Sequence, residues 1–180
     1  MKPYSQSFFD RPVLEVCEDL IGQHLVKDGQ KLLITEIEAY DGPLDLACHA
    51  SKGRTKRTEV LFGPPGRFYV YLCYGIHWLL NVVTGPKDYP AAILIRGAGD
   101  ITGPGRLTKQ LSINADYNTK PATPKTGLYF MPAAASLAKR QHHKIQKTPR
   151  IGVDYAGPVW SQKPYRFLLT SDSSRPSSQQ

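Results

Sequence analysis

Residues 68–83 constrain the fold more than any other part of the chain, because they form two runs of aromatic and β-branched residues. The runs are interrupted at Tyr74-Gly75, which predicts two antiparallel strands joined by a tight turn. The length of the turn decides which side chains share a face. A two-residue loop would put Tyr71 and Asn81 on opposite faces of the hairpin, whereas a three-residue loop would put both on one face.

Residues 31–40 predict another strand, which ends at the turn sequence Asp41-Gly42-Pro43. Side chains alternate across a strand, so regular alternation places four of them on one face: Ile34, Glu36, Glu38 and Tyr40. Two carboxylates and a tyrosine are unusual on a buried face. We therefore expect this face either to meet water or to line a site.

The remaining patterns predict short helices between further strands. Apolar residues recur at helical spacing over residues 13–21, with Asp10 expected as the N-terminal cap and Gly22 as the stop. A second short helix is expected over residues 106–112, where a proline in Gly103-Pro104-Gly105 suits a first turn.

Apolar runs predict additional strands at residues 91–96, 128–131 and 150–153. Residues 115–127 are rich in turn formers and predict a loop, while residues 132–148 are compatible with either helix or loop. Strands interleaved with few helices indicate the α+β class with a largely antiparallel sheet.

The chain of 180 residues has the length of one domain. We expect that domain to cover residues 1–170 and the polar residues 171–180 to form a disordered tail. No apolar run approaches the roughly 20 residues that span a bilayer, and the first residues do not resemble a secretory signal. The three cysteines are odd in number and lack C-x-x-C spacing, which argues against a disulfide framework and indicates a reducing cytoplasm.

Charge is distributed unevenly along the chain. Residues 1–50 hold four basic and nine acidic side chains, whereas residues 51–180 hold nineteen basic and six acidic ones. A basic surface of this size suits a polyanion such as nucleic acid, although scattered lysines on a soluble protein would give the same sum. Two basic stretches are candidates for phosphate contact, at Lys52, Arg54, Lys56 and Arg57 and at Lys139, Arg140, Lys144, Lys147 and Arg150.

Several common signatures are missing from the sequence. There is neither a G-x-x-x-x-G-K-[ST] loop nor a G-x-G-x-x-G turn, so no nucleotide cofactor is implied. No H-E-x-x-H pair occurs among the five histidines, and we expect no metal site. What remains is an acidic strand, a histidine nine residues after Tyr40 and an aromatic hairpin in a basic chain. Of the hairpin aromatics, Tyr69 and Trp78 suit cross-strand packing, and we expect both to belong to the core.

These residues resemble the alkyladenine (3-methyladenine) DNA glycosylase family. The resemblance rests on Glu36-Ile37-Glu38-Ala39-Tyr40 and His49, followed by Tyr69-Val70-Tyr71 with Tyr74-Gly75 and Asn81. It continues through Leu94-Ile95-Arg96, Gly103-Pro104-Gly105-Arg106-Leu107, Arg150-Ile151-Gly152-Val153 and Lys163-Pro164-Tyr165-Arg166-Phe167. It thus covers most of the chain, from about residue 10 to about residue 169.

The resemblance implies a single domain with a curved sheet, flanking short helices and a protruding hairpin. It also implies a monofunctional enzyme that acts as a monomer, needs no cofactor and acts on double-stranded DNA containing damaged purines. Such an enzyme flips the purine out of the duplex and hydrolyses its N-glycosidic bond. An abasic site remains, and alkylated, deaminated and etheno purines are all candidate substrates.

Residue roles follow from the same resemblance. Glu38 would be the general base that activates water, with Arg96 as an active-site support. Tyr40, Tyr71 and His49 would hold the flipped base, and Asn81 would exclude normal guanine at the pocket floor. Because this pocket needs Tyr71 and Asn81 on one face, we expect either an odd-length hairpin loop or a bulge, with Gly75 at positive φ. Tyr74 would fill the gap that the flipped base leaves in the base stack.

Two other classes of function stay open on the residues alone. A non-catalytic nucleic-acid-binding module could use the same basic and aromatic surface. A glycoside hydrolase could use Glu36 and Glu38, since residues two apart on a strand lie roughly 6.5–7 Å apart at the backbone. For Glu36, however, a solvated position or an ion pair with an arginine is the simpler expectation.

Overall fold

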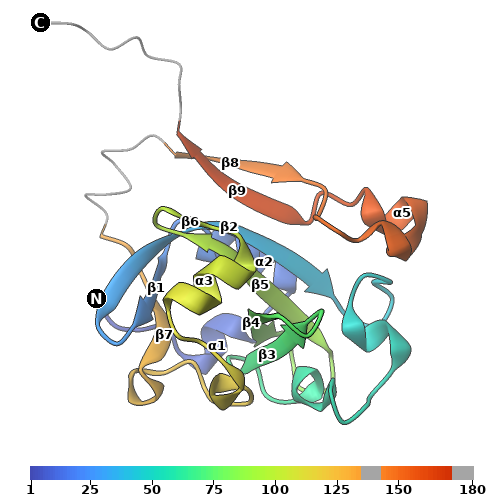
Figure 1. Ribbon diagram of the computed structural model, residues 1–180, viewed down its shortest axis with the longest axis horizontal. Coiled ribbons are helices and arrows are strands. Elements are labelled where there is room, and N and C mark those ends of the chain that lie inside the picture. Colours follow the sequence, from blue (N-terminus) through green and yellow to red (C-terminus); the bar gives the residue numbers. More distant parts are fainter. Residues whose placement is uncertain (135–142, 172–180) are drawn as a thin grey trace, which may run out of the picture.

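The computed structural model describes residues 1–134 and 143–171, and these residues form a single α+β domain built on a nine-stranded sheet. The strand order is β3-β4-β5-β2-β1-β7, with β6 beside β5, β9 beside β2 and β8 beside β9, and all pairings between these strands are antiparallel (Figure 1). The strands are β1 His24–Lys27, β2 Gln30–Asp41, β3 Phe68–Cys73, β4 His77–Thr84, β5 Ala91–Ala98, β6 Ile101–Thr102, β7 Leu128–Met131, β8 His143–Thr148 and β9 Arg166–Ser171.

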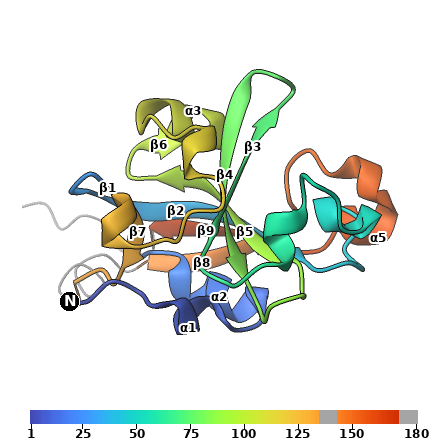
Figure 2. The same cartoon turned by 90° about the horizontal axis from the view of Figure 1, so that it is seen from below.

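Short helices surround this sheet. They are α1 Gln6–Phe9, α2 Val13–Leu20, α3 Pro104–Gln110 and α5 Gly157–Ser161, together with 3-10 turns η1 His49–Lys52, η2 Glu59–Phe62, η3 Ala115–Tyr117, η4 Pro124–Thr126 and η5 Asp154–Ala156. Within the described ranges, none of the helices is long and apolar enough to cross a membrane. The β3–β4 hairpin projects from the body of the molecule beside α3, as Figure 2 shows.

The predicted first helix is confirmed as α2, but its start differs from the expectation. Its apolar face is buried against the sheet, and Gly22 follows it at φ 77°. The residue at the N-cap is Pro12, without a side-chain capping bond. Asp10 instead ends the unpredicted helix α1, where its backbone N–H donates to the carbonyl of Gln6.

Two bulges interrupt the pairing of β2 with β5. Ile34 pairs with Ala98, Glu36 with Gly97 and Ile37 with Ile95, so Thr35 is the extra residue on β2 and Arg96 the extra residue on β5. The prediction that Ile34 shares the face of the two glutamates is therefore wrong. Ile34 is fully buried in the core together with Ile37 and Ala39. A β-bulge changes the direction of the side chain at the extra residue, and the bulge at Arg96 turns this side chain toward the carboxylates of Glu36 and Glu38.

The hairpin has the odd-length loop that the pocket requires. Cys73 pairs with His77, which leaves a three-residue loop with Gly75 at φ 70°. Tyr71 lies opposite Leu79 and Tyr69 lies opposite Asn81, so Tyr71 and Asn81 share one face.

The other segments agree with the sequence in part. The strand at 91–96 and the helix after Gly103 are confirmed as β5 and α3, and the strand at 128–131 is confirmed as β7. Residues 150–153 form an irregular bend rather than the predicted strand. Within the ambiguous segment, residues 143–148 are strand β8, while residues 135–142 lie outside the described part. Ser171 ends β9 rather than beginning a tail, and residues 172–180 lie outside the described part as well.

Candidate active site

A cleft of about 1520 Å³ opens between the β3–β4 hairpin and two loops. Its walls come from residues 46–58, from the hairpin, from the start of α3 and from residues 151–155. A smaller cavity of about 40 Å³ shares several lining residues with the cleft and reaches the sheet between Tyr40, His49, Tyr69, Tyr71 and Asn81. The structure thus brings the predicted pocket residues together.

Glu38 lies on β2 two residues before Tyr40, which lines this cavity, and its own side chain is 0% exposed. Its Oε1 accepts the backbone N–H of Ile151 at 2.8 Å, and its Oε2 accepts the hydroxyl of Tyr40 at 3.0 Å. Nη1 of Arg96 donates to Oε2 at 3.3 Å. Burial raises the pKa of the Glu38 carboxyl, and the positive charge of Arg96 opposes that rise. The carboxylate is therefore both a stronger base than an exposed glutamate and fixed in direction.

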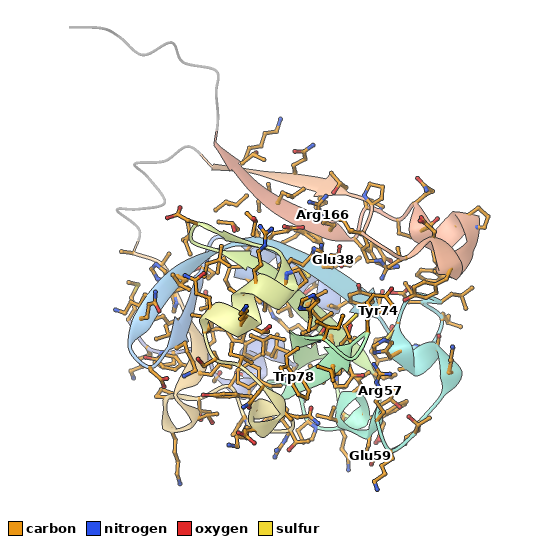
Figure 3. All side chains as sticks on the ribbon, in the orientation of Figure 1. Glu38, Arg57, Glu59, Tyr74, Trp78 and Arg166 are labelled. Atoms are coloured by element: carbon orange, nitrogen blue, oxygen red, sulfur yellow. The ribbon has the colours of Figure 1, made fainter. Side chains whose placement is uncertain are left out.

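Glu36 is held between two arginines. Its Oε1 accepts Nε of Arg96 at 2.8 Å and Nε of Arg166 at 2.6 Å. Arg166 comes from β9 at the position paired with Glu38, and both residues are labelled in Figure 3. The expectation that Glu36 forms an ion pair with an arginine is confirmed. Arg96 donates to both Glu36 and Glu38, and these two bonds fix the orientation of its guanidinium.

His49 begins the turn η1 and faces two tyrosines of β3. Its Nδ1 lies 2.9 Å from the hydroxyl of Tyr69, and its ring meets that of Tyr71 edge-on with centroids 4.7 Å apart. Burial lowers the pKa of His49 to about 4, and the nearby charges of Arg57 and Lys52 add to this effect. The imidazole is therefore neutral near pH 7.

Tyr69 is a pocket residue that the sequence assigned to core packing. It is almost fully buried, as expected, but its hydroxyl also contacts His49 and its carbonyl accepts Nδ2 of Asn81 at 3.0 Å. Alternation along β3 could have revealed this, because Tyr69 and Tyr71 are two residues apart and share a face.

Tyr74 occupies the tip of the hairpin and is 91% exposed (Figure 3). It adopts φ 51°, a left-handed conformation that is uncommon for a bulky residue. The tip thus presents an aromatic ring to solvent at the edge of the cleft.

The two basic stretches are divided between the cleft wall and ion pairs. Lys52, Arg57 and Arg106 are exposed and line the cleft, whereas Arg54 pairs on the surface with Glu59 and Asp88. Arg150 is not a surface cation, because it is buried in an ion pair with Asp45. Lys147 pairs with Glu18, and Lys139 and Arg140 lie outside the described residues.

Among residues 1–134 and 143–171, no group of three or more histidine, cysteine, aspartate or glutamate side chains could hold a metal ion. The site is built from protein groups of another kind, namely one buried carboxylate, two arginines, a neutral imidazole and a cluster of tyrosines.

Comparison with known proteins places this chain in a family. The family profile described as "Methylpurine-DNA glycosylase (MPG)" matches residues 7–102 and 99–173. The chain belongs to that family. Members of the methylpurine-DNA glycosylase family are hydrolases of N-glycosyl bonds, and this chain is an enzyme of that type.

Relatives within the methylpurine-DNA glycosylase family carry one shared description. Proteins named "Putative 3-methyladenine DNA glycosylase" from Nitrosococcus oceani, Myxococcus xanthus and Methanocella arvoryzae are 39%, 42% and 41% identical to the chain. The matches cover 90%, 91% and 90% of this chain and 87%, 88% and 90% of those proteins, respectively. The similarity therefore includes both the hairpin and the segments that surround Glu38.

Proposed function

We propose that the chain is a monofunctional DNA N-glycosylase of base excision repair, which extrudes alkylated purines from duplex DNA and hydrolyses their N-glycosidic bond. The observation that carries this proposal is the buried carboxylate of Glu38, oriented by a hydrogen bond from Tyr40, which lines the aromatic cavity. Its surroundings combine what purine excision requires: a base for water, aromatic rings for stacking and exposed cations for phosphate.

Glu38 acts as the general base in this proposal. A carboxylate has about four acceptor directions, and three of those of Glu38 are occupied by Ile151, Tyr40 and Arg96. The remaining direction can hold a water and take its proton as the water attacks the anomeric carbon. The same negative charge stabilises the oxocarbenium-like sugar, and Arg96 keeps the carboxylate oriented.

The flipped purine lies against Tyr40, His49 and Tyr71. Cationic alkylated bases stack favourably on electron-rich rings. A neutral His49 adds no repulsion against such a base. Asn81, held through its amide nitrogen by Tyr69, forms the floor and excludes the 2-amino group of guanine. Deaminated and etheno purines fit the same stacking mode.

Double-stranded DNA is bound by the cleft rim in this proposal. Tyr74 enters the minor groove and fills the space that the extruded purine leaves, as wedge residues do. Lys52, Arg57 and Arg106 line the rim and contact phosphates, so binding weakens as salt rises. One chain carries all of these groups, which fits action as a monomer.

An inverting glycoside hydrolase is a poorer fit. Such an enzyme needs one of two carboxyl groups as a proton donor. Glu36, the only partner available on the same strand face, accepts two guanidinium groups instead.

The function is tested by base release from a labelled duplex that carries one 7-methylguanine, with etheno-adenine and hypoxanthine duplexes in parallel. We expect release of the free base by the wild-type protein and strand cleavage only after alkali, because the reaction stops at an abasic site. Tight binding without base release from any duplex would contradict the proposal and favour the binding module.

The pH dependence of excision gives a further prediction. Glu38 is a base only when ionised, so the rate on a cationic purine is expected to fall as the pH drops through its pKa. Burial raises that pKa from its ordinary value of 4.5, so the fall begins at a higher pH than an exposed glutamate would give. The measurement is the single-turnover rate between about pH 4.5 and about pH 8, corrected for spontaneous depurination.

The control for this profile is His49→Gln. The pKa of His49 is lowered to about 4, so the imidazole does not titrate over most of this range. We expect the variant to change the rate but not the midpoint of the acid limb. A midpoint that moves to another pH in this variant would assign the limb to His49 and contradict the role of Glu38.

A further inference from the structure

An ion pair behind the pocket joins four segments of the chain. Nη1 and Nη2 of Arg150 donate to the two carboxylate oxygens of Asp45 at 2.5 and 2.9 Å, and both side chains are fully buried. Nη1 also donates to the carbonyl of Ala39 at 2.8 Å, and Nη2 to that of Trp160 at 3.2 Å. Asp45 additionally accepts the backbone N–H groups of Asp41 and Ala47.

The guanidinium of Arg150 is stacked against the proposed base platform. Its Cζ atom lies 4.9 Å from the ring centroid of Tyr40 and 5.2 Å from that of Tyr165. Tyr40 lines both the cleft and the small cavity, whereas Arg150 lines neither. Because Arg150 is also fully buried, it covers the side of the Tyr40 ring that faces away from the pocket.

This position puts a charge close to the bound base. A purine stacked on the open face of Tyr40 would lie about 8 Å from the guanidinium, given a ring-to-ring separation of roughly 3.5 Å. An unpaired cation there would repel a purine that carries a positive charge after alkylation at a ring nitrogen. It would leave a neutral purine of the same shape almost unaffected. Asp45, bonded to the guanidinium in two places, removes most of that field.

We propose that Asp45 and Arg150 are specificity-determining residues, and that neutralisation of Arg150 by Asp45 allows the Tyr40 platform to accept cationic purines. The proposal rests on the function proposed above. A merely structural pair would affect all bound bases alike, whereas a pair that acts through charge affects cationic and neutral bases differently.

The test uses two probes of equal shape and different charge. The cationic probe is a duplex with 7-methylguanine, and the neutral probe is a duplex with 7-methyl-7-deazaguanine. Both carry a 2′-fluoro sugar, because fluorine destabilises the oxocarbenium ion and so prevents cleavage during the measurement. The quantity compared is the ratio of the two dissociation constants. A loss of folded protein affects both constants equally and cancels in this ratio.

Asp45→Asn leaves the charge of Arg150 uncompensated and is expected to weaken binding of the cationic probe relative to the neutral probe by up to about fivefold, the factor for a unit charge about 8 Å away at an effective dielectric constant of about 40. Arg150→Gln leaves the charge of Asp45 and is expected to shift the ratio by a similar factor in the opposite direction. The double variant is expected to restore the wild-type ratio. Arg150→Lys keeps the charge without the bidentate geometry, and is the matched control in which the ratio stays within about twofold.

The proposal predicts the direction in which each single variant changes the ratio of the two dissociation constants. Either variant is therefore a sufficient test if it folds. A ratio that stays at the wild-type value in a folded single variant, or shifts the same way in both, would overturn it. If the wild-type protein binds neither probe more tightly than an undamaged duplex, the proposed function itself fails. Those two failures are therefore distinguishable.

Discussion

Replacement of Glu38 by glutamine is expected to lower the single-turnover rate of base release by about 10³-fold or more, because general-base catalysis contributes roughly 10²–10⁴-fold and the oxocarbenium-like sugar also loses its facing charge. Glutamine keeps the size of the side chain and can still accept the N–H of Ile151. DNA binding is therefore expected to persist. The measurement is the release of 7-methylguanine from a labelled duplex with enzyme in excess.

Glu59→Gln is the matched control, because Glu59 is exposed on the surface and pairs with Arg54 away from the cavity (Figure 3). We expect wild-type rates from it. Equal rates for wild type and Glu38→Gln, with the same protein concentration and unchanged thermal unfolding, would rule out Glu38 as the base.

Removal of the ring at the hairpin tip is the second large effect that we expect. Tyr74→Ala should lower excision from duplex DNA by about 10- to 100-fold, since stacking of an aromatic ring on bases contributes roughly 1–3 kcal/mol. Tyr74 is almost fully exposed, so the change should leave the thermal stability near that of the wild type. The measurement combines the single-turnover rate with the fluorescence of a 2-aminopurine placed beside the lesion, which reports unstacking.

The control for the hairpin is Val159→Ala on α5, an exposed apolar residue that does not line the cleft. It should keep the wild-type rate. A second comparison locates the defect: on single-stranded substrate no gap has to be filled, so Tyr74→Ala should lose much less activity there. An equal loss on single and double strands would contradict the wedge role.

The sequence predicted best where a rule links residue order directly to geometry. The period-two alternation of strands, combined with the pocket, predicted an odd-length hairpin loop or a bulge with Gly75 at positive φ, and the structure has a three-residue loop. The same alternation placed Glu36, Glu38 and Tyr40 on one face. It failed at Ile34, because a bulge at Thr35 shifts the register and leaves no mark in the pattern of polar and apolar residues.

Long-range partners were beyond the reach of such rules. Arg150 belongs to a run of basic residues in the sequence, and only the tertiary fold reveals that it is buried against Asp45. Arg166 likewise meets Glu36 because β9 pairs with β2, although 130 positions separate the two residues. Tyr69 was recognised as buried, but its hydrogen bond to His49 depends on the path of residues 41–48.

The bonds that complete the site also set when it can exist during synthesis of the chain. Ile151 meets Glu38 across 113 positions, Arg150 meets Asp45 across 105, and Arg166 meets Glu36 across 130. Closing loops of this length is a late and slow step in folding. The carboxylate of Glu38 therefore acquires its partners only after nearly all of the described chain has emerged from the ribosome. A nascent or truncated chain would hold the aromatic hairpin without a working catalytic centre, so hydrolytic activity reports completion of the fold.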